Sequence, residues 1–308
     1  MEFALYRFRL APSETLFLPA RNKGNVLRGA LGGMLRELSC DPACPGAGRC
    51  PRRATCPYAQ VFEPAPPPGA PALSNYLAIP RPFVIRAPLE EKTRYEAGES
   101  LDFELVLAGR IVELLPWFQQ SFERLAERGL GLNRARCVLG SAGRVEIARP
   151  EYAAPRQTGG IAVRFLTPTH LVFGGQTVRH PEFHHLFKRL RDRLNALSTF
   201  YCGAPLQLDF KGLGQRAEQV ACVRRDLRWE ERERRSSRTG MRHPIGGLLG
   251  ECLFAGDLAE FLPLLWLGQY LHVGKHAAWG NGRLELLPGP EHMAEARRLR
   301  GRFRRTTT

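Results

Sequence analysis

The chain has 308 residues, more than a single hydrophobic core usually organises, so we expect two domains. Its 45 Lys and Arg residues exceed its 30 Asp and Glu residues, and the net charge of +15 indicates a polyanionic partner, nucleic acid before an anionic membrane. No apolar run approaches the ~20 residues of a membrane span, and no secretory signal is visible, which excludes a membrane-spanning protein and predicts a cytoplasmic one.

The first half of the chain predicts the order strand, helix, two strands, helix and strand. Residues 2–10 alternate in polarity and predict a strand, and apolar residues at helical spacing predict a helix over about 25–38. The other expected elements are strands around 76–86 and 101–109, a helix marked by apolar residues from Ile111 to Leu125, and strand segments at 136–140 and 144–148.

A joint rich in proline and glycine at 150–160 precedes a second copy of this pattern. The expected elements are a strand at 161–166, a helix marked by apolar residues from Phe183 to Leu197, strands at 219–229 and 246–254, a helix marked by Leu258 to Leu265, and a strand at 283–287.

The order β-α-β-β-α-β therefore occurs twice, and we predict an α+β protein of tandem ferredoxin-like folds. The expected domains are residues 1–152, with a Cys-rich insertion at 39–75, and residues 153–290, followed by a basic tail at 291–308. The arginines of this tail support nucleic-acid binding without locating a site.

Four cysteines lie within 17 residues in a segment with too few apolar residues for its own core: Cys40, Cys44, Cys50 and Cys56. Because disulfides are rare in the cytoplasm, the cluster favours a structural zinc site that forms a metal knuckle. An iron–sulfur cluster and free thiols are the alternatives, since the spacing lacks paired Cys-x2-Cys knuckles. The remaining cysteines are expected to be buried small hydrophobes.

A glycine-rich loop over residues 272–283 joins the last expected helix to the last expected strand. Gly274, Gly280 and Gly282 free the backbone for positive φ or for close approach to a ligand. The loop also carries cationic donors and an aromatic stacking face, which suit a phosphodiester backbone with unstacked bases: Lys275, His276, Trp279 and Arg283. An ordinary helix-to-strand turn is the alternative interpretation.

Three segments resemble the Cas-six (Cas6) family of CRISPR repeat-processing endoribonucleases, in the RAMP superfamily. Residues 263–283 resemble the family's C-terminal glycine-rich signature. Residues 164–201 run from Arg-Phe-Leu-Thr-Pro-Thr-His into a long amphipathic helix, as in that family. Residues 19–62 combine Asn-Val-Leu-Arg-Gly-Ala-Leu-Gly with the cysteine cluster.

The resemblance implies an enzyme that binds the CRISPR repeat in precursor RNA and cuts it without metal catalysis. The ribose 2′-oxygen attacks phosphorus, giving a 2′,3′-cyclic phosphate and a 5′-hydroxyl. Expected partners are repeat RNA or crRNA and subunits of a CRISPR effector complex, with no membrane. Two other functions remain open: a non-catalytic crRNA-binding RAMP subunit and an unrelated zinc-knuckle nucleic-acid-binding protein.

Many members of the family place a catalytic histidine near the first helix, and here no histidine precedes His170. The catalytic candidates are therefore two histidines of the glycine loop and two cations near the first helix: His272, His276, Lys23 and Arg28. Histidine suits proton transfer near neutral pH, and Lys or Arg stabilises charge at phosphorus. The expected RNA-binding residues are Gly274, Lys275, Trp279, Gly280, Gly282, Arg283 and Arg36.

Overall fold

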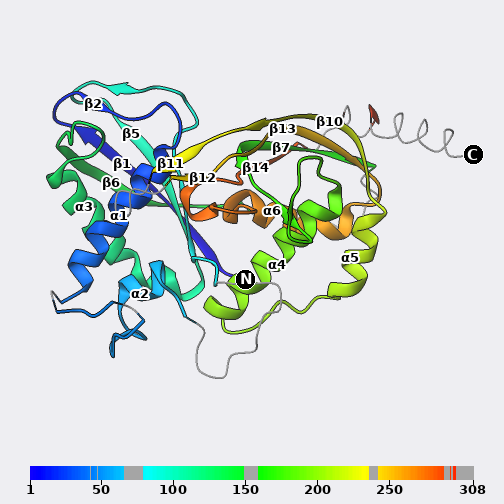
Figure 1. Ribbon diagram of the computed structural model, residues 1–308, viewed down its shortest axis with the longest axis horizontal. Coiled ribbons are helices and arrows are strands. Elements are labelled where there is room, and N and C mark those ends of the chain that lie inside the picture. Colours follow the sequence, from blue (N-terminus) through cyan, green and yellow to red (C-terminus); the bar gives the residue numbers. More distant parts are fainter. Residues whose placement is uncertain are drawn as a thin grey trace, which may run out of the picture. The chain divides into compact units, whose positions relative to one another are not determined.

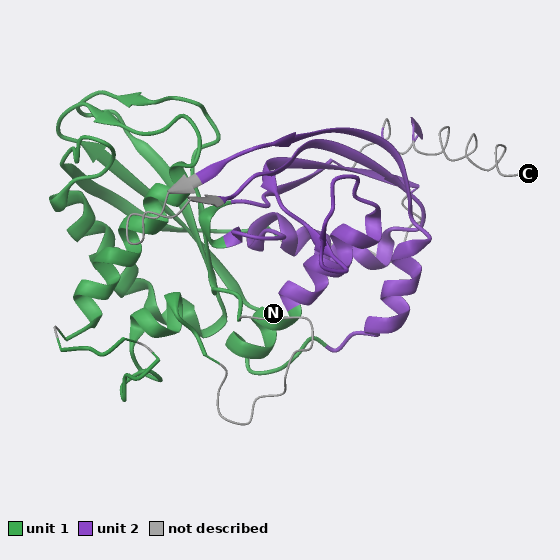
Figure 2. Ribbon diagram, in the orientation of Figure 1, with its two compact units in different colours: residues 1–148, 195–206, 278–280 green, residues 149–194, 207–277, 281–308 purple. Residues whose placement is uncertain are grey.

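The computed structural model describes residues 1–41, 43–46, 48–65, 79–148, 159–235, 242–287, 292 and 294–295. The chain forms two compact units (Figure 2). Unit 1 comprises residues 1–148, 195–206 and 278–280, and unit 2 comprises residues 149–194, 207–277 and 281–308.

Unit 1 is built on a four-stranded antiparallel sheet with the strand order β3-β5-β1-β6 (Figure 1). Its main elements are β1 (Phe3–Pro12), α1 (Lys23–Ser39), β3 (Phe83–Arg86), β5 (Leu101–Ala108), α3 (Leu115–Arg128) and β6 (Cys137–Val145). The smaller elements are β2 (Leu16–Phe17), α2 (Pro57–Phe62), β4 (Arg94–Tyr95) and the 3-10 helix η1 (Gly109–Leu114). The first and third main strands are central and the second and fourth lie at the edges, which is the ferredoxin-like arrangement.

Unit 2 repeats this topology with the strand order β10-β13-β7-β14. Its main elements are β7 (Gly160–Thr169), α4 (Phe183–Tyr201, whose last turns belong to unit 1), β10 (Ala221–Glu230), β13 (Gly247–Ala255), α6 (Leu262–Leu271) and β14 (Leu284–Leu287). The additional elements are the hairpins β8 (Val172–Phe173) with β9 (Gln176–Thr177) and β11 (Glu233–Arg235) with β12 (Arg242–Pro244), the helix α5 (Phe210–Glu218), and the 3-10 helices η2 (Ala259–Phe261) and η3 (Ala277–Trp279, divided between the units).

Aromatic side chains form the core of each unit. In unit 1 the ring of Phe8 lies 5.4 Å from that of Phe103 and 4.9 Å from that of Phe122. These rings come from β1, β5 and α3, so they join the central strands to a helix. In unit 2, Phe183 of α4 contacts Phe254 of β13 at 5.2 Å between ring centroids. Burial of such large rings is the main favourable contribution to folding of each unit.

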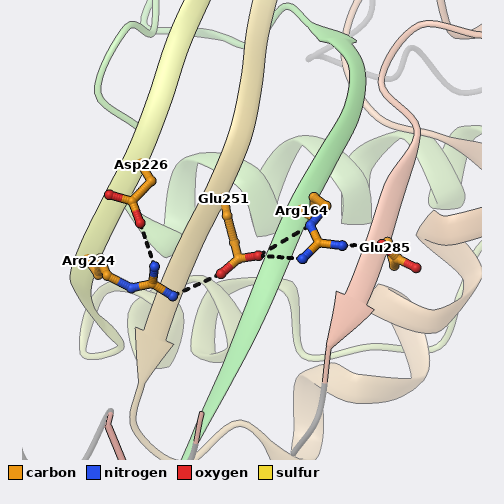
Figure 3. Close-up of polar contacts among 5 residues, drawn as sticks. All are labelled: Arg164, Arg224, Asp226, Glu251 and Glu285. Carbon is orange, nitrogen blue, oxygen red and sulfur yellow. Dashed lines mark hydrogen bonds and ion pairs between the residues drawn. The ribbon is translucent and has the colours of Figure 1, made fainter. Parts of the chain in front are cut away.

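Charged side chains on the exposed sheet faces are paired across neighbouring strands. In unit 2, Glu251 of β13 pairs with Arg224 of β10 at 2.9 Å and with Arg164 of β7 at 3.1 Å (Figure 3). Arg164 also reaches Glu285 of β14 at 3.2 Å, and Arg224 reaches Asp226. The row therefore crosses all four strands, as the register of Arg164 opposite both glutamates requires.

The predicted tandem of ferredoxin-like folds is confirmed in element order and sheet topology. Several details differ from the prediction. The strand segments expected at 136–140 and 144–148 form one strand, β6, and helix α5 was not predicted. Helix α2 lies inside the predicted insertion at 39–75, whose end at 66–75 is outside the described residues.

The predicted domain limits at 152–153 and 290–291 also lie outside the described residues, as do the tail arginines. Residues 195–206 and 278–280 belong to unit 1, although the prediction assigned both segments to the second domain. No helix in the described part of the chain is both long and apolar enough to cross a membrane.

Candidate functional site

The loop from His272 to Arg283 follows α6 and enters β14, as predicted, and its glycines have positive φ. At Gly282, φ is 73°, and a Cβ atom would lie 1.8 Å from the carbonyl oxygen of Val273. At Gly280, φ is 88°, and a Cβ atom would lie 2.5 Å from the carbonyl oxygen of Ile85 in β3. Glycine is therefore required at both positions by the packing of the protein itself.

The unit 2 part of the loop is held by hydrogen bonds within the loop and to neighbouring segments of unit 2. His272 is fully buried, and its Nδ1 lies 3.0 Å from the carbonyl oxygen of Asn281. The Asn281 side chain donates to the carbonyl oxygen of Ile245, and Arg283 N donates to Thr167 Oγ1 at 2.9 Å. The buried His272 side chain thus stabilises the conformation of the loop.

Lys275 and His276 form the outer part of the loop. Lys275 is exposed and has no ion-pair partner among the described residues. Its backbone N–H donates to the carbonyl oxygen of His170 at 3.0 Å, which fixes the loop to the end of β7. His276 is half-buried and has a φ of 64°. Of the two loop histidines, His276 is the one that a ligand can reach.

His170, whose carbonyl oxygen accepts the hydrogen bond from Lys275 N, was not among the predicted site residues. Its Nε2 lies 3.1 Å from Thr177 Oγ1, and its ring meets the edge of Trp229 at 5.4 Å. Arg179 covers the Trp229 ring at 4.0 Å. Burial, followed by the positive charge of Lys275, lowers the pKa of His170 and favours a neutral imidazole. The Thr-Pro-Thr-His sequence at the end of a predicted strand was the feature of the sequence that could have identified His170 as a candidate site residue.

In unit 1, the loop residue Trp279 packs against α1. The Arg28 guanidinium lies 5.8 Å from the Trp279 ring and 4.8 Å from that of Phe62. A Cβ atom at Gly24 would lie 2.2 Å from the Trp279 carbonyl oxygen, so the helix needs glycine there. Unit 1 therefore brings together three of the predicted site residues: Arg28, Trp279 and Gly280.

Lys23 lies at the start of α1 but is almost fully buried, at 2% exposure. Its Nζ donates to the carbonyl oxygens of Ala20 and Glu90. Burial lowers the pKa of Lys23, and the charges of Glu90 and Glu91 oppose this change. In this conformation Lys23 fixes the backbone at the start of α1 and does not face solvent.

The four clustered cysteines interact in pairs around the end of α1 and the start of α2. Burial raises the pKa of Cys40 to about 11, and the charge of Cys56 and a hydrogen bond with Cys44 add to the rise. A hydrogen bond from the Gly46 backbone lowers the pKa of Cys44, and contacts with Cys40 and Cys50 contribute. Even so, no three His, Cys, Asp or Glu side chains within the described ranges are close enough to hold a metal ion. The zinc site stays a prediction.

The fold and the loop define a class of protein: tandem ferredoxin-like units in which a glycine-rich loop connects the last helix to the last strand. Residues 163–284, which contain the whole loop, match the model of the family described as CRISPR-associated endoribonuclease Cas6. The predicted resemblance to the Cas6 family is confirmed by this match. Residues 1–153 match a second family, AF_1859_N, described as an N-terminal domain.

Solved structures share the fold at low sequence identity. A product complex of Cas6 (TTHB231) is 17% identical, with a TM-score of 0.57 over 93% of this chain and 100% of that chain. Thermus thermophilus Cas6 (TTHB231) is 16% identical, with a TM-score of 0.54 over 92% of this chain and 98% of that chain. A chain of a partial Cas6-RT-Cas1–Cas2 complex is 13% identical, with a TM-score of 0.56 over 94% of this chain and 46% of that chain. No curated protein matches the sequence.

Proposed function

We propose that this protein binds the repeat of CRISPR precursor RNA and cuts it once per repeat. The observation that carries the proposal is the match of residues 163–284 to the Cas6 endoribonuclease family, because it includes the complete glycine-rich loop. The net charge of +15 supports a polyanionic substrate. The family match also argues against an unrelated zinc-knuckle protein.

The proposed reaction is an in-line transesterification that needs no metal ion. The ribose 2′-oxygen loses its proton to a base and forms a bond to phosphorus, while the bond from phosphorus to the 5′-oxygen breaks. An acid protonates that oxygen, so the products are a 2′,3′-cyclic phosphate and a 5′-hydroxyl. Support comes from the family resemblance and from the many carboxylates that are occupied by arginine partners, such as Glu251 and Asp102.

We assign roles according to exposure. His276 is the first candidate for proton transfer, because RNA can reach it, and Arg28 is the candidate that stabilises charge on the phosphate. His272 and Lys23 are buried, so we propose that they support the loop and α1 and meet RNA only if these segments move. The RNA-binding candidates remain Gly274, Lys275, Trp279, Gly280, Gly282, Arg283 and Arg36.

The experiment is a cleavage assay with repeat RNA in EDTA. We expect cleavage to persist in EDTA and to stop when the nucleotide 5′ of the cut carries 2′-deoxyribose, since the nucleophile is then missing. The matched control carries 2′-deoxyribose one nucleotide away and should be cut normally. Cleavage of the first substrate at the same phosphate contradicts the mechanism.

One observation favours a second function, that of a non-catalytic crRNA-binding subunit. Unit 1 contains no histidine, and one of the two loop histidines is buried. Binding of repeat RNA at nanomolar protein concentration without any cleavage in single-turnover conditions would select this function. Such a subunit would still need the glycine loop and its cations.

We further propose that Cys40, Cys44, Cys50 and Cys56 bind one structural zinc ion. Thiolates are preferred zinc ligands, and pairs of these cysteines already interact. Zinc binding then requires the four sulfur atoms to move closer to one another. An iron–sulfur cluster is the alternative for the same four thiolates.

Elemental analysis of protein purified without chelators should find about one zinc per chain. Cys44→Ser should lower the thermal midpoint and the zinc content together, because metal binding and local folding are coupled. Cys202→Ser, outside the segment, is the control and should keep the zinc. Protein that contains neither zinc nor iron contradicts the site.

A further inference from the structure

A column of alternating arginine and aromatic side chains runs along α1 and α2 in unit 1. It begins at Trp279, continues through Arg28 to Phe62, and reaches Arg36 through Tyr58. The Tyr58 and Phe62 rings are stacked, with centroids 5.5 Å apart and planes 7° apart, and the Arg36 guanidinium lies 6.0 Å from the Tyr58 ring.

The sequence of α1 explains the column. Arg28, Gly32 and Arg36 are spaced by four residues, so they lie on one face of the helix. Gly32 leaves room for the Phe62 ring, since a Cβ atom there would lie 2.9 Å from Phe62 Cε1. The face is therefore shaped to receive α2 between its two arginines, and both guanidinium groups gain an aromatic neighbour.

Exposed arginines extend the column into the cysteine segment. Arg36 lies one turn before the first cysteine, and its carbonyl oxygen accepts a hydrogen bond from Cys40 N at 2.9 Å. Arg52 lies one turn before α2, where its carbonyl oxygen accepts a hydrogen bond from Cys56 N at 2.8 Å. Arg49 and Arg52 are exposed. We name the surface formed by Trp279, Arg28, Tyr58, Arg36, Arg49 and Arg52 the α1–α2 track.

The arginines of the track differ from Arg7 and Arg9 of the exposed sheet face in the same unit. Arg7 pairs with Glu104 at 3.1 Å and Arg9 with Asp102 at 2.9 Å, so carboxylates offset part of their charge. Arg36, Arg49 and Arg52 form no ion pair with any residue that the structure describes. The nearby Glu37 is occupied by Arg128 at 2.6 Å. Positive charge on the track is therefore available to a ligand.

We propose that single-stranded RNA binds along the α1–α2 track, from Trp279 towards the cysteine segment. The inference rests on the proposed function and extends it, because it assigns an RNA surface to α2 and to Arg49 and Arg52. The guanidinium groups of Arg36, Arg49 and Arg52 suit a phosphate backbone, and the partly exposed Trp279 and Tyr58 rings offer stacking faces to unpaired bases. An acidic peptide would use the same cations but would gain little from the rings.

The test compares two double variants that remove the same charge from unit 1. Arg49→Ala with Arg52→Ala removes the far end of the track. Arg136→Ala with Arg144→Ala removes two exposed arginines beside or within β6, which also form no ion pair in the described part of the chain. The probe is a 12-nucleotide oligouridine, which has no base pairs, and binding is measured by fluorescence anisotropy at several salt concentrations.

We expect the track variant to bind the oligouridine at least about tenfold more weakly than the wild type, and the control variant to bind like the wild type. Because each phosphate contact contributes about −0.7 to the slope of log K against log salt for single strands, the slope of the track variant should be less steep by about 1.4. Equal affinities and slopes for the two variants overturn the proposal, as does a wild-type protein that does not bind the probe.

The same preparations separate this inference from the proposed function. If the wild type fails to cut repeat RNA but the track variant alone loses oligouridine binding, the endonuclease proposal fails and the track stands. If repeat RNA is cut and both variants bind the probe equally, the track fails and the endonuclease stands. Thermal midpoints verify that both variants are folded, and Arg52→Gln against Arg144→Gln repeats the comparison with single changes.

Discussion

At the scale of single residues, the glycine loop has two kinds of members. Gly280 and Gly282 face the protein's own carbonyl oxygens, and His272 is buried, so these residues determine the shape of the loop. Lys275 is exposed on its outer side and is available to a ligand. The sequence alone assigns all of them to RNA, because spacing does not reveal which side of a loop faces solvent.

The mutation Gly280→Ala tests this division. We expect it to lower the free energy of unfolding by about 1–3 kcal/mol, because a φ of 88° strains alanine and the new Cβ meets the Ile85 carbonyl oxygen. Denaturant unfolding measures the change. RNA affinity of the folded fraction, measured on the same preparation, should fall little.

The matched control is Gly33→Ala on α1, where the added Cβ meets no atom within 4 Å. It should stabilise the protein by about 0.5–1 kcal/mol, since alanine is the better helix former. A Gly280→Ala protein of wild-type stability that has lost RNA binding would instead assign Gly280 to direct contact with RNA.

At the scale of elements, the start of α4 contains two neighbouring histidines. The rings of His184 and His185 are 4.0 Å apart and both contact Phe173 of β8. Nδ1 of His185 accepts a hydrogen bond from the Glu182 backbone N–H, which only an unprotonated nitrogen can do. Burial is the main cause that lowers the pKa of both histidines, while Lys188 adds to the effect and Glu182 opposes it.

Stability should therefore fall as the pH drops below about 6.5. In that range the unfolded chain takes up protons on histidine that the folded protein does not, so protonation favours unfolding. We expect a lower thermal midpoint at pH 5.5 than at pH 7.5, and a smaller difference in His184→Gln. The exposed His180 provides the control, since His180→Gln should keep the wild-type difference. Identical midpoints at the two pH values would contradict this account.

The elements themselves are well predicted where hydrophobic periodicity is strong. Helix α1 was expected over about 25–38 and spans Lys23–Ser39, because its buried leucines recur at helical spacing. Helix α5 was missed, since Phe210–Glu218 contains two glycines and only short apolar stretches, and its N-cap is the Asp209 side chain. Helix α2 was hidden in the proline-rich insertion, although Pro57 suits the first turn of a helix.

The candidate site was predicted only in part. The glycine loop and Arg28 were found because their residue types are unusual for a plain turn or helix. The contact of Arg28 with Trp279 could not be predicted, because it joins segments more than 200 residues apart in the sequence. Burial of Lys23 was equally unpredictable, since it depends on the carbonyl oxygen of Glu90 in a distant loop.

At the scale of the whole molecule, much of the positive charge on the exposed sheet faces is paired with carboxylates. In unit 1, Arg86 and Arg7 both form ion pairs with Glu104. In unit 2, Glu251 forms ion pairs with Arg164 and Arg224. The unit 2 row also includes Glu285 and Asp226 and so contains three carboxylates for two guanidinium groups, which means that it does not attract RNA strongly. Among the described residues, the exposed cations without an ion pair include Lys275 on the glycine loop and Arg36, Arg49 and Arg52 on the α1–α2 track.

The division of the chain between the units has a consequence for synthesis on the ribosome. Unit 1 includes residues 195–206 and 278–280, with Tyr201 donating to the Pro80 carbonyl oxygen and Gly280 packed on Ile85. An emerging N-terminal half therefore lacks two pieces of its own structure. It reaches its final contacts only after residue 280 has been translated, so the first domain to be made is not complete until most of unit 2 has followed it.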